Sequence, residues 1–174
     1  MKFSLLITVL MLIISACNSQ EQKQELPYTT KIEFEESMIQ SHKRFIEKSA
    51  TAINAYIDSS DYNFIASGTG LRYAIIENGY GVQPKKGNEV KIKYTIKFLD
   101  GEAVMEYDIP KVMSFFIEQS DVETGLHEAL QLMKVGEKSV FIFPPHLAFG
   151  MSGNRNGIPP QSTLVYTIEL EAIR

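Results

Sequence analysis

The stretch VKIKYTIKFL, residues 90–99, alternates apolar side chains with three lysines and a threonine. Successive side chains of a β-strand point to opposite faces of the sheet, so this pattern predicts a strand with one buried and one solvated face. Asp100 and Gly101 follow it directly and are typical of a tight hairpin turn. The segment therefore predicts an antiparallel sheet with a cationic face in water.

Apolar runs elsewhere predict the elements that pack with this strand. Further strands are expected at residues 71–77, 103–107, 114–117, 139–143 and 163–173. Between them, Ser120 and Glu123 have the spacing of a capping box that starts a helix, and Gly136 is expected to close that helix. Its core-facing residues are predicted to be Leu126, Ala129, Leu130 and Met133. The expected class is α+β, an antiparallel sheet wrapped around a short helix and preceded by an N-terminal helix.

Length and composition limit the kinds of protein to consider. A chain of 174 residues, 44% hydrophobic and 22% charged, has room for one modest folded domain plus a tail. The net charge of −4 gives no support for nucleic-acid binding. One cysteine excludes an intrachain disulfide. The three histidines, His42, His127 and His146, lack metal-ligand spacing, and we expect ordinary surface or edge residues and no metal or other cofactor.

The first residues resemble a bacterial lipoprotein signal. The apolar run 3–14 is short for a membrane span but suits a signal peptide, and Ile14-Ser15-Ala16-Cys17 resembles a lipobox. Residues 1–16 are then a lipoprotein signal peptide, and Cys17 is the lipid attachment site that anchors the chain to a membrane. A secretory signal that happens to contain a cysteine, or a short signal anchor, is the alternative. Asn18 after the cysteine favours the outer membrane by resemblance to a known sorting rule.

A polar tether and a helix follow this signal. Residues 17–33 are expected to form a lipid-anchored flexible tether, because residues 18–27 are rich in Gln and Glu. Residues 34–66 are expected to form a helical extension, in which the helix covers 34–58. Its apolar stripe is formed by Met38, Ile39, His42, Phe45, Ile46, Ala50, Ile53 and Ile57. The stripe either packs on the main domain, which we favour, or meets a partner helix in a homodimer.

Residues 81–174 resemble the FKBP-type peptidyl-prolyl cis-trans isomerases. The resemblance rests on VKIKYT and LDG in residues 90–101, GLHEAL and LMKVGEK in residues 125–138, and PHLAFG and IPPQSTLVY in residues 145–166. These motifs occur in the family's order and spacing, so residues 67–174 are expected to form an FKBP-type domain. The lipobox and helix resemble a membrane-anchored subgroup, some members of which are associated with gliding motility in flavobacteria.

The resemblance implies a pocket between the short helix and the sheet. Tyr94, Leu126, Phe149 and Tyr166 match the residues that the family uses for catalysis. The substrate-binding positions correspond to Val104, Met105, Met113, Phe115, Val122, Glu123 and Ile158, and the alignment leaves open whether Met113 or Phe115 forms the wall. Glu123 is expected to contribute its backbone N–H rather than its side chain. The bland interpretation of Tyr94 and Tyr166 is that of core aromatics with a polar tip.

Three positions depart from the family's pattern. Met105 stands in place of an Asp, Phe149 in place of a hydrogen-bonding Tyr, and Asn154 where some members have His. A lost hydrogen bond is worth about 0.5–1.5 kcal/mol, so a reduced enzyme is expected rather than an inactive one. The resemblance implies an isomerase of proline-containing polypeptides that assists the folding of exported or surface proteins. The alternative is a catalytically weak peptide-binding or assembly module of the cell envelope.

Overall fold

The computed structural model describes residues 31–104, 107 and 109–174 of the chain. Residues 1–30, which contain the expected signal peptide, Cys17 and most of the tether, lie outside the described residues. The elements are α2 (Lys31–Ser59), β1 (Ile65–Ala66), β2 (Arg72–Glu77), β3 (Glu89–Phe98), β4 (Lys111–Phe116), α3 (Thr124–Leu132), β5 (Lys138–Phe143), the 3-10 turn η3 (Pro145–Leu147) and β6 (Leu164–Ile173). They confirm an α+β class with an N-terminal helix.

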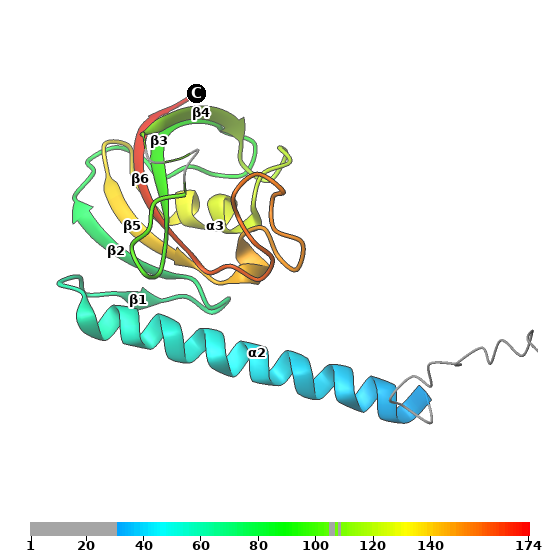
Figure 1. The fold of residues 1–174 in the computed structure, drawn as a ribbon. Helices are drawn as coiled ribbons and strands as arrows, with labels where there is room; N and C mark the ends of the chain where they lie inside the picture. The colour runs from blue at the N-terminus through cyan, green and yellow to red at the C-terminus, as the bar shows by residue number, and fades with distance from the viewer. Residues whose placement is uncertain (1–30, 105–106, 108) are drawn as a thin grey trace, which may run out of the picture. The chain divides into compact units, whose positions relative to one another are not determined.

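The strands form one six-stranded antiparallel sheet in the order β1-β2-β5-β6-β3-β4. Figure 1 shows the sheet curving around α3, which lies in its hollow. Strands β3 and β6 lie next to each other in the sheet and pair along most of their length, with Tyr94 opposite Ile168. The strand expected at residues 103–107 is wrong for the described residues of that range, where Ala103 forms only an isolated bridge to Lys97. The short β1 was not predicted.

The alternation in β3 has the predicted consequence for burial. Val90, Ile92 and Ile96 are 0–1% exposed and belong to the core, whereas the three lysines of the strand are exposed. Helix α3 closes the same core from the hollow of the sheet. The four predicted core residues of this helix region are 0–1% exposed: Leu126, Ala129, Leu130 and Met133. Both periodicities, two for the strand and 3.6 for the helix, are thus confirmed.

The predicted ends of α3 are wrong. The helix starts at Thr124 after the N-cap residue Glu123, and no side chain caps it. Ser120 Oγ instead accepts a hydrogen bond of 2.9 Å from the Phe116 N–H and closes the turn after β4. At the other end the helix stops at Leu132. Gly136, with φ of 82°, forms the turn before β5 rather than the helix terminus.

The chain divides into two units between residues 42 and 43, so the described residues 31–42 belong to one unit and 43–174 to the other. Helix α2 begins at Lys31 rather than at residue 34, so the last residues of the expected tether are helical. Within the second unit, Ile53 is 5% exposed and packs in a small cluster with Val140, Ile142 and Val165. These strand residues point away from α3, because neighbouring Phe141 and Phe143 belong to the main core. Ser49 and Thr163 add a hydroxyl–hydroxyl hydrogen bond of 3.1 Å.

Residues 43–59 of α2, which belong to the second unit, therefore cover the convex face of the sheet. This agrees with the favoured interpretation that the apolar stripe packs on the main domain. The stripe is only partly used for this purpose, because Ile46 of the same unit is 54% exposed. In residues 31–42, Met38 and Ile39 are 57% and 68% exposed. None of the helices in the described part of the chain is long and apolar enough to cross a membrane.

Candidate functional site

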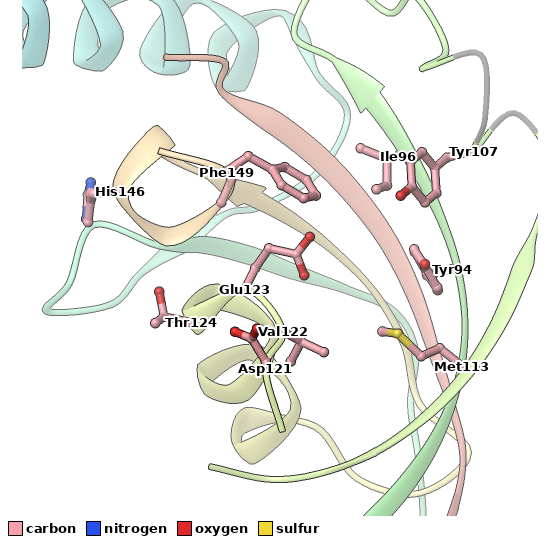
Figure 2. Close-up of a pocket in the computed structure, with 11 residues that line it drawn as sticks. Tyr94, Ile96, Tyr107, Met113, Asp121, Val122, Glu123, Thr124, His146 and Phe149 are labelled. Atoms are coloured by element: carbon pink, nitrogen blue, oxygen red, sulfur yellow. The ribbon is translucent and has the colours of Figure 1, made fainter. Parts of the chain in front are cut away.

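A pocket of about 520 Å³ opens between the start of α3, strand β3 and the loop after β5. Its size is typical of sites for small ligands or peptide side chains. Figure 2 shows the side chains converging on it from these separate elements. The lining residues are Tyr94 and Ile96 of β3, Tyr107, Met113 of β4, residues 121–124, His146, Ala148 and Phe149.

Aromatic rings form most of the pocket wall and continue into the core beneath it. The rings of Tyr94 and Tyr107 lie 5.9 Å apart, and Tyr94 stacks on Tyr166 with centroids 6.2 Å apart. Tyr166 in turn stacks on Phe143 at 4.4 Å. Because Tyr166 is fully buried, the pocket rests on packed rings rather than on mobile surface side chains.

The structure brings five of the predicted site residues to the pocket surface. These are Tyr94, Met113, Val122, Glu123 and Phe149. Of the two candidates for the pocket wall, Met113 and Phe115, Met113 lines the pocket in the structure. Phe115 is 5% exposed and meets the His127 ring edge-on at 5.5 Å.

The other predicted residues lie in the core and not on the pocket surface. Each is at most 5% exposed: Val104, Phe115, Leu126, Ile158 and Tyr166. They pack directly against the lining residues in one cluster, so they shape the pocket from behind. Met105 and Cys17 lie outside the described residues.

Sequence reasoning missed six lining residues: Ile96, Tyr107, Asp121, Thr124, His146 and Ala148. Two of them could have been predicted from their positions in the sequence. Ile96 lies two positions after Tyr94 in a strand and must share its face. His146 immediately follows Pro145 in the motif PHLAFG, which also contains the predicted site residue Phe149. It was expected to be an ordinary edge residue, and the structure places it at the pocket with its Nε2 2.9 Å from the Thr69 carbonyl oxygen.

Glu123 is the main electrostatic feature of the pocket. Its side chain extends into the space bounded by Phe149 on one side and Tyr94 on the other, as Figure 2 shows. Burial raises the pKa of this carboxyl group, because the charged form loses water. Hydrogen bonds from its own backbone N–H and from the Tyr166 hydroxyl, at 3.4 Å, oppose that rise in pKa.

Asn154, one of the three departures from the family's pattern, holds the loop that carries Ile158. Its Oδ1 accepts hydrogen bonds from the backbone N–H groups of Asn156 and Ile158 at 2.8 and 2.9 Å. Its own N–H donates to the Ile158 carbonyl at 3.1 Å. These bonds fix the backbone from residue 154 to residue 158 behind the pocket. Within residues 31–104, 107 and 109–174, no cluster of His, Cys, Asp and Glu could hold a metal ion.

Comparisons with known proteins agree with this geometry. The family model described as FKBP-type peptidyl-prolyl cis-trans isomerase matches residues 81–171, just over half of the chain. The protein FkpA of Escherichia coli, an isomerase of this type by name, is 39% identical over 105 residues. That match covers 60% of this chain and 38% of the relative, so the chain spans well under half of that protein's length.

Two further similarities extend into the N-terminal region. A probable FkpA of Neisseria meningitidis is 27% identical over 161 residues, which cover 89% of this chain and 57% of the relative. The crystal structure of Escherichia coli FkpA matches with a TM-score of 0.57 at 26% identity. That match covers 100% of this chain and 82% of the solved one.

Proposed function

Because the chain belongs to the FKBP-type peptidyl-prolyl cis-trans isomerase family, we propose that its pocket catalyses rotation about X-Pro bonds in polypeptides. The observation that carries the proposal is the aromatic pocket itself. Tyr94 and Phe149, which the family motifs assign to catalysis, line the same cavity above the buried ring of Tyr166. The pocket is large enough for a proline ring and its neighbouring peptide groups.

Catalysis of X-Pro rotation requires an apolar environment around the bond rather than a nucleophile, an acid or a base. Rotation about the peptide C–N bond has a barrier of about 18–20 kcal/mol, because the planar amide is stabilised by resonance. That resonance separates charge, and it is lost when the bond is twisted. An apolar wall such as Tyr94, Ile96 and Phe149 solvates the planar, charge-separated form poorly, so the twisted form is favoured relative to it.

The test is NMR exchange spectroscopy on an Ala-Pro-Phe-type peptide with the full-length chain, in mild detergent, at catalytic amounts. Acceleration of cis–trans exchange above the uncatalysed rate is expected. Phe149→Tyr is run beside the natural chain. If neither protein accelerates cis–trans exchange, the catalytic proposal is rejected. Acceleration by the variant alone would mean that the natural pocket binds the peptide but catalyses its rotation poorly.

The second candidate function is a catalytically weak peptide-binding or assembly module of the cell envelope. The observation in its favour is Phe149, which contributes a ring but no hydroxyl to the pocket. Binding of a proline peptide with no rate enhancement would support it. A matched norleucine-for-proline peptide controls for binding that does not depend on proline.

The proposed setting is the cell envelope, with exported or surface proteins as clients. It is supported by the lipobox sequence that ends at Cys17 and by Asn18, which favours the outer membrane. Incorporation of an alkyne-bearing fatty acid into the natural chain, lost in Cys17→Ser, tests the lipid attachment. Membrane fractionation tests the location, and motility of a deletion strain tests the resemblance to the gliding-associated subgroup.

A homodimer through the N-terminal helix is the remaining proposal on partners. It is supported by the exposed apolar side chains of Met38, Ile39 and Ile46 on α2. Sedimentation of the full-length chain in density-matched detergent measures the mass directly. A monomer mass at high protein concentration would reject the dimer, and replacement of Ile39 and Ile46 by Gln should dissociate a true one.

A further inference from the structure

We propose that the Glu123 carboxylate makes this pocket select proline sites that have a lysine or an arginine next to the proline. The inference rests on the proposed isomerase function and names its substrate class. It follows from where Glu123 lies, from the charges around it and from the hydrogen-bonding capacity of its carboxylate.

The position of Glu123 makes its charge available to a bound peptide. The residue precedes α3, where the backbone leaves the turn after β4, and its side chain is directed into the pocket rather than into water (Figure 2). It shares the pocket lining with Tyr94, Tyr107 and Phe149. A proline bound against these rings brings its neighbouring residues to within side-chain reach of the carboxylate.

The charges around the pocket favour a cationic guest. The lining contains two acids, Glu123 and the exposed Asp121, and no lysine or arginine among the described residues. Tyr94, Tyr107 and His146 line the same pocket as Glu123, the Tyr166 hydroxyl contacts its carboxylate at 3.4 Å, and His127 of α3 acts on it electrostatically. The Nε2 of His146 is 2.9 Å from the Thr69 carbonyl oxygen. His127 is itself engaged, because its Nδ1 accepts the Glu118 N–H at 3.0 Å. A like-charged Asp or Glu in the peptide would be repelled.

The carboxylate has room for further donors. An ionised carboxylate accepts about four hydrogen bonds. The described donors to Glu123 are its own backbone N–H and the Tyr166 hydroxyl at 3.4 Å, the latter a long contact. An ammonium or guanidinium group would supply short charge-assisted bonds in partly desolvated surroundings, where such bonds are stronger than in water.

The test compares peptides that differ only in the charge next to proline. Ala-Lys-Pro-Phe is matched with its norleucine analogue, which keeps the alkyl chain without the ammonium, and a second pair carries the same residues after proline. Exchange rates are measured with the full-length chain in mild detergent. In at least one pair we expect kcat/KM to favour lysine by about fivefold or more, a factor within reach of one charge-assisted hydrogen bond.

Glu123→Gln should reduce this preference to less than about twofold, because the amide keeps the shape but loses the charge. Glu77→Gln is the matched control. Glu77 lies on β2, is 66% exposed and pairs with Lys138 on the surface, so its loss should leave the preference unchanged. The preference should also weaken as the pH is lowered through the pKa of Glu123, since protonation removes the charge.

The outcomes separate the two proposals. Exchange catalysed equally well for lysine and norleucine peptides would overturn the charge selection and leave the isomerase intact. If the chain accelerates exchange of none of the peptides, the isomerase proposal is rejected. Chemical-shift titration of the same peptide pairs would then test the charge preference through their binding affinities. The pH profile uses the natural chain, so a preference that does not change between pH 8 and pH 4 would overturn the inference even if Glu123→Gln failed to fold.

Discussion

Replacing Phe149 by tyrosine adds one hydroxyl to the pocket wall and changes little else. The ring of Phe149 is half-buried and points across the cavity, so a hydroxyl at its far end would lie inside the pocket (Figure 2). The cavity of about 520 Å³ can accommodate one oxygen atom without a clash against the core. The substitution therefore tests the missing donor and not the packing.

The magnitude follows from the free energy of one hydrogen bond. A donor that reaches a carbonyl of the bound peptide contributes about 0.5–1.5 kcal/mol. Since about 1.36 kcal/mol corresponds to a tenfold change in rate, Phe149→Tyr should raise kcat/KM about two- to twelvefold. The gain should be largest in KM if the bond forms equally in the bound and twisted states.

The assay is NMR exchange on an Ala-Pro-Phe-type peptide, with Phe149→Leu as the control that removes the ring. Leucine should lower kcat/KM, because the aromatic wall is lost. The double variant with Glu123→Gln checks that the new hydroxyl is not simply bonded to that carboxylate. An unchanged or lower kcat/KM for tyrosine in both backgrounds, beside an active natural chain, would refute the reasoning.

Three further predictions concern stability, each measured by urea unfolding. Ile53→Ala should destabilise the fold by about 2–5 kcal/mol, because Ile53 is 5% exposed, whereas exposed Ile46→Ala should change it by less than about 0.5 kcal/mol. Gly125→Ala should cost about 1–3 kcal/mol, since its Cβ would lie 2.6 Å from a carbonyl oxygen of η3, and Gly68→Ala, with open space around it, should not. Glu123→Gln should stabilise the chain above the raised pKa of the carboxyl group, and that gain should vanish below the unfolded pKa, because desolvation penalises only the charged form. A gain from Glu123→Gln that grows towards acid pH would contradict the sign.

The regular elements of the fold could be predicted from the sequence, because burial of one face makes apolar residues recur with the period of the strand or helix. The alternation in residues 90–99 predicted β3, and the spacing of Leu126, Leu130 and Met133 predicted the buried face of α3. The pocket residues required the family resemblance, because nothing local distinguishes Tyr94 from an ordinary strand aromatic. Five of those residues line the cavity, and five more lie directly behind it in the core, while Met105 lies outside the described residues.

Some of the errors occurred where a residue's partner is distant in sequence. Ser120 and Glu123 have the spacing of a capping box, yet Glu123 approaches Tyr166, 43 positions further along the chain. Similarly, Ile46 and Ile53 belong to one apolar stripe, and only the convex face of the sheet determines that Ile53 is the buried one. His146 reaches the pocket from the 3-10 turn η3 and Tyr107 from the connection between β3 and β4, and such short segments have no sequence period that predicts their position.

The isomerisation and the charge selection proposed for the pocket depend on the same physical property, the exclusion of water. Poor solvation of the planar amide lowers the barrier to rotation, and it is produced by the rings of Tyr94 and Phe149. The same poor solvation raises the pKa of Glu123 and strengthens its attraction for a cation. A substitution that opens the pocket to water, such as Phe149→Ala, should therefore reduce both the isomerisation rate and the preference for lysine. Glu123→Gln leaves the rings of Tyr94 and Phe149 in place, so it should reduce the preference for lysine far more than the rate on a norleucine peptide.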